Sequence, residues 1–367
     1  MKRVRDKVDK ENTSIEYYVG GEHFDVGEIR ITKKGMIQGS TIGPAFHMRF
    51  TPGDVLLMSR NPHLRKAGVV DFEGICSDVS YVLRTKDEEK MLQDYLIYVL
   101  HTDSFWNFAE ANKKGSTNFF LNWTDFERYE FNLPSLEVQK KLTALLSAVT
   151  KTRYLYKDLL NKIDELIKAR FIEFFGDPIE NSEGWKTEKL ENVAPIVAAE
   201  LPEEDIYWWL NLDMIQSNTG NLIDKIWTPK EDIGKSTTTF NDSMVLYSKL
   251  RPYLNKVLVP DGYGYATTEL VTLNPNPNIL NKYFLSNLLR GDEFVRYAND
   301  LSSGAQMPRM PMKKLRSFPC ILPPIELQNE FVKFAKKSEH VKVDIIQSIE
   351  ETNELIKALM EENQITK

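Results

Sequence analysis

Two segments of the chain show apolar residues at steps of three and four, the spacing that is typical of a long amphipathic helix. The first begins near Ser135 and ends at Gly176-Asp177-Pro178, since a glycine followed closely by a proline commonly ends a helix. The second follows Leu322. Each spans roughly 35–40 residues, or about 50–60 Å at 1.5 Å per residue. The apolar positions are Leu142, Leu146, Val149, Tyr156, Leu160, Ile163, Ile167 and Phe174 in the first helix, and Leu327, Phe331, Phe334, Val341, Ile345, Ile349, Ile356 and Leu359 in the second.

This pattern is that of a coiled coil, sustained in the first helix over about five heptads. Arg153 and Arg170 fill two seam positions that would otherwise be apolar. We therefore expect the two helices to pack on each other. A globular unit precedes each helix, so antiparallel packing would place the two units at opposite ends of a rod, related by a pseudo-two-fold axis.

The regions before the helices show shorter elements. Residues 17–90 have the pattern of short strands and turns, with Thr51-Pro52-Gly53-Asp54 as a turn before an apolar run. Helical spacing returns at residues 90–110, and Gly115 ends that region. In the second half we predict strands at residues 207–215, 243–247 and 269–273, and a helix at residues 282–297 that ends at Ser302-Ser303-Gly304.

The two halves repeat each other. The string LPSLEVQ begins at Leu133, and the similar string LPPIELQ begins at Leu322. Before these strings the match continues without gaps at the same offset, with Gly115 falling on Gly304. Solenoid repeats have periods of about 20–50 residues, so this much longer unit is instead a whole domain plus a helix. We predict an α+β protein with two similar α/β domains, joined and separated by two long antiparallel coiled-coil helices. The expected boundaries are 1–132 and 178–321 for the domains, and 133–177 and 322–367 for the helical regions.

The repeat is imperfect at its start. The second domain opens with Trp185 to Leu190, which we expect to form its first strand. The first domain has no equivalent, because after a charged leader it enters directly at Tyr17-Tyr18-Val19. The first domain is therefore expected to lack its opening strand; the alternative is that this strand is supplied in another way.

Composition places the chain among ordinary globular proteins, with 42% hydrophobic and 11% aromatic residues. No run approaches 18 consecutive apolar residues, and the N-terminus MKRVRDKVDKENTS lacks the apolar core of a secretory signal. We expect a cytoplasmic protein without a membrane partner. Cys76 and Cys320 do not occupy equivalent repeat positions, so we expect free thiols.

The net charge of −6 is mildly unfavourable for a nucleic-acid-binding protein. The charge is unevenly distributed, however. Acidic residues concentrate between Glu180 and Asp205 and in the last helix, whereas basic residues gather in a few loops of each repeat. A local basic face therefore remains compatible with the composition.

The sequence offers little for catalysis. It contains neither GxGxxG nor GxxxxGK[ST], and the string LNPNPN at Leu273 lacks the paired prolines and the aromatic residue of an adenine methyltransferase motif. None of the five histidines has metal-ligand spacing to a cysteine or acidic residue. We predict no catalytic residue and no metal site.

Two kinds of loop are candidates for binding DNA. A basic turn follows an apolar strand in each repeat, and a loop around Gly115 or Gly304 follows the short helical region. Cationic side chains can contact phosphates, while Asn, His and Arg can also read base edges in the major groove. The alternatives are a solvated hairpin for the first kind and a helix C-cap for the second. The candidate residues are Arg60, Asn61, His63, Arg65, Lys66, Lys113, Lys114 and Asn118 in the first half, and Lys249, Arg251, Tyr253, Asn255, Lys256, Ser302, Gln306 and Arg309 in the second.

Three strings resemble a known family. SSGAQMPRMPMKKLRSFPCILPPIELQ resembles the end of a target-recognition domain in the specificity subunit of Type I restriction-modification systems. ARFIEFFGDP, from Ala169 to Pro178, resembles the end of that family's central helical region. Gly184-Trp185 followed by Leu190 resembles the opening of its second recognition domain.

The resemblance implies a non-catalytic subunit in which each recognition domain reads one half of a bipartite DNA target, and the two helices set the spacer. It also implies two modification subunits, which methylate adenine N6 with S-adenosylmethionine, and restriction subunits that use ATP and Mg²⁺; this chain itself would bind no cofactor. A protein–protein scaffold, with a coiled-coil rod and two end domains, is the alternative. DNA binding that weakens steeply with salt would favour the specificity subunit.

Overall fold

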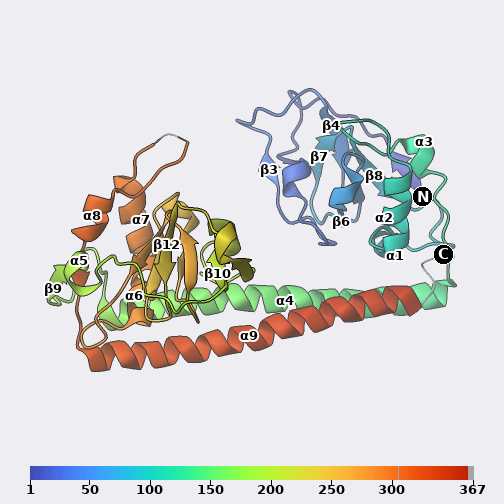
Figure 1. The fold of residues 1–367 in the computed structure, drawn as a ribbon. Coiled ribbons are helices and arrows are strands. Elements are labelled where there is room, and N and C mark those ends of the chain that lie inside the picture. Colours follow the sequence, from blue (N-terminus) through green and yellow to red (C-terminus); the bar gives the residue numbers. More distant parts are fainter. Residues whose placement is uncertain (305, 363–367) are drawn as a thin grey trace. The chain divides into compact units, whose positions relative to one another are not determined.

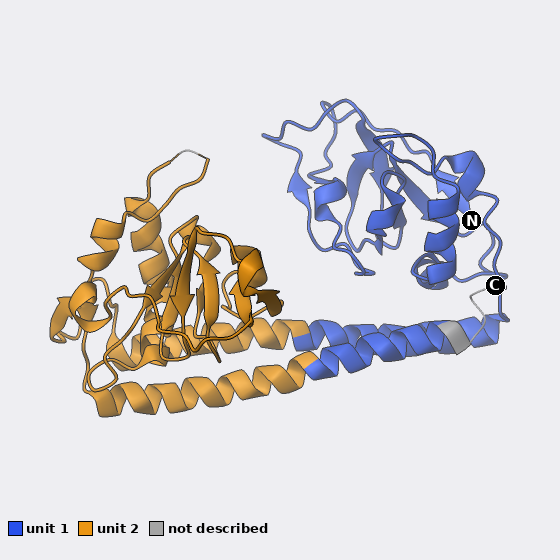
Figure 2. Cartoon of the chain, viewed as in Figure 1, with its two compact units in different colours: residues 1–156, 347–367 blue, residues 157–346 orange. Residues whose placement is uncertain are grey.

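The computed structural model describes residues 1–304 and 306–362 (Figure 1). It divides into two compact units (Figure 2). Unit 1 comprises residues 1–156 and the end of the chain from residue 347, and unit 2 comprises residues 157–346. Each unit combines an α/β domain with parts of two long helices, α4 (Leu136–Phe175) and α9 (Ile325–Glu362). The start and end of α4 agree with the prediction from the sequence.

The domain of unit 1 contains two four-stranded sheets, with strand orders β1-β8-β5-β6 and β3-β2-β7-β4. Every pairing is antiparallel except that of β2 with β7. The strands are β1 (Lys2–Val4), β2 (Tyr17–Val19), β3 (Gly35–Met36), β4 (Phe46–Phe50), β5 (Val55–Met58), β6 (Ala67–Val69), β7 (Gly74–Ser77) and β8 (Ser80–Arg84). The helices are α1 (Gln93–Leu100), α2 (Asp103–Ala111) and α3 (Trp123–Phe126), with 3₁₀ turns η1 (Gly21–His23) and η2 (Pro62–Leu64).

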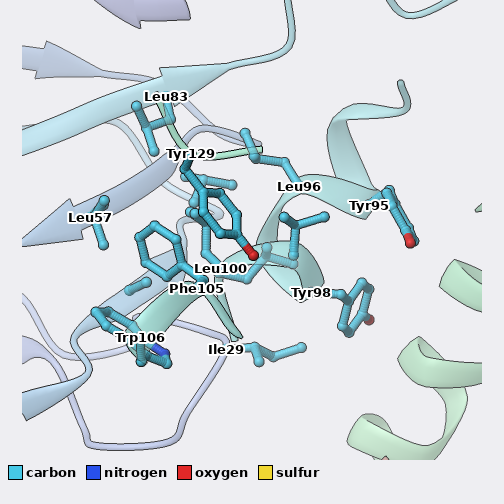
Figure 3. Close-up of a cluster of buried hydrophobic side chains, with 14 of the residues drawn as sticks. Ile29, Leu57, Leu83, Tyr95, Leu96, Tyr98, Leu100, Phe105, Trp106 and Tyr129 are labelled. Atoms are coloured by element: carbon cyan, nitrogen blue, oxygen red, sulfur yellow. The ribbon is translucent and has the colours of Figure 1, made fainter. Parts of the chain in front are cut away.

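The apolar run in β5 is continuous because both faces of the strand are buried. Val55 and Leu57 point into the cluster that α1 and α2 complete (Figure 3), whereas Leu56 points into a second cluster on the other face. Successive side chains of a strand alternate between its faces, so three adjacent apolar residues serve two cores.

The domain of unit 2 repeats this architecture with strand orders β11-β10-β15-β12, β14-β13-β16 and β17-β9. Its strands are β9 (Thr187–Lys189), β10 (Ile206–Leu210), β11 (Ile226–Pro229), β12 (Thr237–Phe240), β13 (Val245–Ser248), β14 (Val257–Leu258), β15 (Gly264–Thr267), β16 (Leu270–Leu273) and β17 (Pro319–Ile321). Its helices are α5 (Leu190–Val193), α6 (Lys282–Arg290), α7 (Asp292–Leu301) and α8 (Met312–Arg316), with 3₁₀ turns η3 (Leu212–Met214), η4 (Lys230–Asp232) and η5 (Pro252–Leu254).

The single helices predicted at residues 90–110 and 282–297 are each two helices. Thr102 caps the start of α2, since its hydroxyl accepts a hydrogen bond from the backbone N–H of Phe105 at 3.2 Å. Gly291 separates α6 from α7 at the equivalent point. The apolar spacing continues through both breaks, so periodicity alone could not reveal them.

Within each unit the two long helices run antiparallel. In unit 2, Asp164 accepts a hydrogen bond from Lys342 at 2.7 Å, whereas Phe175, at the end of α4, packs its ring on Phe331 near the start of α9. In unit 1, Arg153 donates to Asn353 at 3.0 Å. The predicted α+β class, with two similar domains and an antiparallel helix pair, is confirmed.

The residues that form the polar contacts between the long helices occupy equivalent positions in the two repeats. Arg153 and Lys342 occupy equivalent positions, separated by the same offset as Leu133 and Leu322, and so do Asp164 and Asn353. Both cations are at least nine-tenths buried, and Arg153 also donates to Glu28 of its own domain at 2.7 Å. A buried polar pair in an apolar seam favours one helix register over others. Arg170 differs, because its guanidinium lies over the rings of Phe174 and Phe334.

The charged leader contributes a strand to the first domain. It forms β1, and Lys2 pairs with Arg84 of β8 just as Ile196 bridges Leu273 in unit 2. The expectation that the first domain enters directly at Tyr17 is therefore wrong. The opening strand nevertheless differs between the domains, since β9 pairs with β17 in unit 2 whereas the described residues of unit 1 form no strand at the equivalent stretch, 130–132.

Both cysteines are buried free thiols, as predicted. Burial raises the pKa of Cys76 and of Cys320 to about 12, so both thiols are neutral.

The last residue of each repeated string is a glutamine with a structural role. Gln139 is fully buried at the start of α4. Its Oε1 accepts from the backbone N–H of Leu92 at 3.0 Å, and its Nε2 donates to the carbonyls of Lys90 and Pro134, both at 2.8 Å. One side chain thus fastens the long helix to the residues that precede α1.

Gln328 makes the same three contacts in unit 2. Its partners are the N–H of Asn281 at 2.9 Å and the carbonyls of Ile279 at 3.0 Å and Pro323 at 2.8 Å. Each partner is the repeat equivalent of its counterpart in unit 1. The string therefore repeats because each domain needs this attachment to its helix.

Replacing Gln139 with Leu should destabilise the protein, because it leaves one backbone N–H and two carbonyls buried without partners. We expect a loss of about 2–5 kcal/mol in the free energy of unfolding, measured by urea denaturation. Gln347→Leu is the control, since Gln347 is exposed and bonds only to the nearby Glu351. Equal stability of the two variants would contradict the assigned role of Gln139.

Candidate nucleic-acid interface

The basic turn has the same backbone in both units. In unit 1 a 3₁₀ turn at Pro62–Leu64 is flanked by Asn61 and Arg65, whose φ angles are 51° and 48°. In unit 2 the turn at Pro252–Leu254 is flanked by Arg251 and Asn255, with φ of 50° and 47°. The left-handed region is unfavourable for a residue with a side chain, although Asn tolerates it better than most. The surrounding structure must hold Arg65 and Arg251 in this conformation.

One lysine anchors each basic turn. The Nζ of Lys66 donates to the carbonyl of Gly21 at 2.7 Å, and that of Lys256 donates to the carbonyl of Leu212 at 2.6 Å. Both lysines are half-buried, and burial lowers the pKa of Lys256. These two candidates therefore tie the turn to η1 or η3.

The loop after α2 lies beside the basic turn in unit 1. The backbone N–H of Asn61 donates to the carbonyl of Phe119 at 2.8 Å, and that of Leu121 donates to Ser59 at 2.8 Å. Lys114 and Phe120 exchange two backbone hydrogen bonds, which close the loop. We call the basic turn and this loop together the paired loops.

Unit 2 builds its paired loops with equivalent bonds. Arg251 N–H donates to Pro308 at 2.7 Å, and Met310 N–H donates to Lys249 at 2.9 Å. Ser303 and Arg309 exchange the two closing bonds. Two stretches that the sequence suggested separately thus form one surface in each unit.

A glycine makes each closing loop possible. Gly115 and Gly304 have φ of 103° and 109°. A Cβ at Gly115 would also lie 2.5 Å from the carbonyl oxygen of Asn118, closer than real Cβ contacts. The matching of these glycines between the repeats therefore has a backbone cause.

Several candidate cations already have acidic partners. Arg65 pairs with Asp103 at 2.6 Å, Lys113 with Glu110 at 2.6 Å, Lys114 with Asp125 at 2.8 Å and Arg309 with Glu269 at 3.0 Å. The Lys114 ammonium lowers the pKa of Asp125 through its hydrogen bond, and the bond to Glu269 raises the pKa of Arg309. Sequence reasoning missed these acids, because they lie outside the basic strings.

Other candidates are occupied by bonds that hold the fold. Asn255 is 4% exposed, and its Nδ2 donates to the carbonyl of Arg290 at 2.9 Å. Ser302 donates to the carbonyl of Ala298 at 2.6 Å, which supports the C-cap alternative at this position.

In the described part of the chain, the third group of candidate residues forms neither an ion pair with an acid nor a side-chain bond that holds the fold. Among residues 1–304 and 306–362, the structure pairs the side chains of Arg60, Lys249 and Arg251 with no carboxylate. The Nε of Arg251 is buried without a partner. The side chains of His63, Asn118, Tyr253 and Gln306 are exposed on the same loops. With the half-buried Asn61, these seven residues are the candidates that the paired loops leave available to contact a ligand.

Metal-binding clusters and membrane-spanning helices are both absent from the described residues. No group of three or more His, Cys, Asp or Glu side chains is arranged to hold a metal ion there. None of the helices in those residues combines the length and the apolar character needed to cross a membrane.

The sequence of the chain also matches the model of a protein family. The model of the Type I restriction modification DNA specificity domain matches residues 21–165 and 182–361, once in each half of the chain. The chain belongs to this family. Each match includes one set of paired loops and most of the long helix that follows it.

A curated member of this family is similar to the chain in sequence. The Type I restriction enzyme EcoDI specificity subunit of Escherichia coli is 22% identical over 262 residues, which cover 60% of this chain and 57% of that protein. The alignment therefore spans little more than half of the curated relative.

Solved structures are similar over nearly the whole chain. One comes from work on complex assembly and conformational transition of the type I R-M system, with 19% identity, a TM-score of 0.55 and coverage of 98% and 93% of the two chains. Another is the Type-I restriction-modification system S subunit from M. genitalium, with 12% identity, a TM-score of 0.50 and coverage of 95% and 91%. These likenesses show the fold.

Replacing Lys256 with Met should loosen the basic turn of unit 2, because the turn loses its bond to the carbonyl of Leu212. We expect faster amide hydrogen exchange in residues 250–256, measured by mass spectrometry. Lys249→Met is the matched control, since Lys249 lies on the same loop without an anchoring bond. Unchanged exchange in the Lys256 variant would show that the turn is held by other contacts.

Proposed function

We propose that this chain is the DNA sequence-specificity subunit of a Type I restriction-modification complex. It binds a bipartite DNA target and directs adenine-N6 methylation and restriction by partner subunits. The observation that carries this proposal is that one loop frame is built twice with different presented side chains.

The residues that form the frame are the same in both units. They are the proline and leucine of the 3₁₀ turn, the anchoring lysine and the loop glycine, namely Pro62, Leu64, Lys66 and Gly115, and Pro252, Leu254, Lys256 and Gly304. The presented positions differ, since His63 corresponds to Tyr253 and Arg60 to Leu250. A shared frame with different side chains can place different donors and acceptors against DNA. We infer that the two units read two different half-sites.

The candidate residues then divide by role. Arg60, Asn61, His63 and Asn118 in unit 1, and Lys249, Arg251, Tyr253 and Gln306 in unit 2, are proposed to contact the DNA. Arg65, Lys113, Lys114 and Arg309 are proposed to bind phosphates. The ion pairs of Arg65 and Arg309 are accessible to solvent and contribute only about 0–1 kcal/mol each, so exchanging their carboxylates for phosphates costs little. Lys66, Lys256, Asn255 and Ser302 are proposed to hold the loops in place.

The helices are proposed to set the distance between the half-sites. The 40 residues of α4 correspond to about 60 Å at 1.5 Å per residue, whereas one turn of B-DNA is about 34 Å. A helix of this length suits half-sites more than one turn apart.

Two modification subunits are proposed to bind along the helices. Apolar residues that lie seven or fourteen positions apart on α4 stay exposed, with Thr152 at the intervening position: Val138 at 36%, Leu145 at 46%, Leu159 at 42% and Leu166 at 48%. This spacing matches the heptad of a second seam, which fits a helix from another protein. The modification subunits would supply S-adenosylmethionine chemistry and the restriction subunits ATP- and Mg²⁺-dependent chemistry, in the cytoplasm. This chain contributes no catalytic residue.

The same exposed seam also favours a second function, a protein–protein scaffold without DNA recognition. Binding of the purified chain to duplex DNA at increasing salt separates the two. A steep loss of affinity with salt supports phosphate contacts, and a complete absence of DNA binding would favour the scaffold.

Replacing Arg251 with Gln should weaken recognition of one half-site only, because Arg251 belongs to the paired loops of unit 2. We expect a loss of about 1–3 kcal/mol in binding, that is, roughly 5- to 150-fold. Genome-wide mapping of methylated adenines, in cells with this chain and its modification subunit, measures which half-site relaxes. Arg296→Gln on α7 is the control. Equal relaxation of both half-sites would contradict the division between the units.

Shortening the helix pair by one heptad should change the spacing but not the half-sites. Residues 157–163 of α4 and 343–349 of α9 lie between the two polar seam contacts, so removing both segments preserves the seam. The helices become shorter by about 10 Å, which corresponds to roughly 3 base pairs. The same mapping experiment should report unchanged half-sites with a shorter spacer. A change in base identity within a half-site would contradict the proposed role of the helices.

A further inference from the structure

Unit 1 has an open cavity beside its N-terminus. Its volume is about 530 Å³. The apolar wall is aromatic and comes from α3 and the residues that follow it, whereas the rim is cationic. The wall consists of Trp123, Phe126, Tyr129 and Phe131, and the rim of Met1, Lys2, Arg3, Arg5, Lys86 and the single acid Glu127.

Unit 2 shows what covers the equivalent surface there. The strand β9 (Thr187–Lys189) pairs antiparallel with β17, and α5 contacts α8. Two further backbone bonds extend the pairing, from Leu190 to the carbonyl of Phe318 at 2.9 Å and from Leu322 to that of Lys186 at 2.7 Å. The apolar residues of the covering segment, Leu190, Val193 and Ala194, are at most 2% exposed. Residues 184–194 therefore form a lid of one strand and one helical turn.

The counterpart of this surface in unit 1 has no lid. At the offset of the repeat, α8 corresponds to α3, and β17 corresponds to residues 130–132. No described residue pairs with the backbone of 130–132. Leu133 is 43% exposed, and Asn132 is exposed where Ile321 is fully buried. An unpaired strand edge beside an apolar wall is a site for strand addition.

The charges around the cavity narrow the class of ligand. Lys2, Arg5 and Lys86 are exposed, and Arg3 and the Met1 amine are half-buried. Burial and the nearby Lys86 lower the pKa of the Met1 amine. With one acid among several cations, the rim attracts a ligand that carries carboxylates.

We propose that this cavity is the docking site for a segment of a partner polypeptide. The segment is extended, pairs with the backbone of residues 130–133, continues into a helical turn with branched apolar side chains on the partly exposed Trp123 and Phe131, and carries acidic residues toward the rim. Residues 184–194 display the apolar part of this chemistry with Leu190 and Val193, and they carry Glu188 and Glu191 together with Lys186 and Lys189. Among the described residues that segment is already paired with β17.

The probe for this site is a synthetic peptide of residues 182–196, SEGWKTEKLENVAPI, labelled with a fluorophore. We expect it to bind the full-length chain with one-to-one stoichiometry in fluorescence anisotropy. The peptide with Leu190→Asp and Val193→Asp should bind at least tenfold more weakly, because two apolar contacts are lost. Equal binding of the two peptides would overturn the proposal.

Protein variants locate the binding site. Leu133→Pro removes the N–H that corresponds to the Leu322 donor in unit 2, so we expect at least a tenfold loss of peptide affinity. Glu130→Pro is the matched control, since unit 2 has Pro319 at this position and still pairs. Retained affinity in Leu133→Pro would overturn the proposal. The peptide would then bind elsewhere, for example by displacing the lid of unit 2.

Circular dichroism would detect a failure of Leu133→Pro to fold. A third variant tests the site in that case. Arg5→Glu with Lys86→Glu reverses two exposed rim charges and should weaken binding of the peptide, with a smaller salt dependence than in the unchanged protein. Unchanged affinity in this variant would overturn the proposal. These measurements use no DNA, so their outcome is independent of the specificity-subunit function.

Discussion

The buried side-chain amide at the base of each domain is the interaction on which the rest of the structure depends. Gln139 and Gln328 each satisfy one backbone N–H and two carbonyls where a domain meets its long helix. A buried polar group without these partners would be strongly unfavourable, so the junction has one geometry. A rigid junction allows a helix to position a domain, whereas a flexible linker would not.

The paired loops also have a framework that is the same in both units. The proline, leucine, lysine and glycine that shape the loops recur in both units, and backbone hydrogen bonds join the two loops at equivalent residues. The side chains that the loops present do not recur. A frame held by backbone bonds and a half-buried lysine tolerates changes at exposed positions, because those positions contribute little to folding. The proposed reading of two different half-sites follows from this separation.

The two units differ most where the first has an open cavity. In unit 2 the strand β9 pairs with β17, and the helical turn that follows buries three apolar residues. In unit 1 the corresponding backbone lacks a described partner and the wall is aromatic. The repeat in the sequence suggested a missing strand but not the cationic rim, which Lys2, Arg3, Arg5 and Lys86 form where β1 pairs with β8. An asymmetry in the sequence thus becomes a surface with defined chemistry.

The sequence by itself determined the two long helices, the start and end of the first, the duplication and the loops that carry cations. These features depend on local periodicity, on glycine and proline, and on residue identity at a fixed offset. Tertiary structure decided the rest. It paired Arg65, Lys114 and Arg309 with acids outside the basic strings, gave Lys66 and Lys256 anchoring roles, and joined two loops that are distant in sequence. The physical reason is that the partner of a long charged side chain is set by packing between distant segments, which no local pattern records.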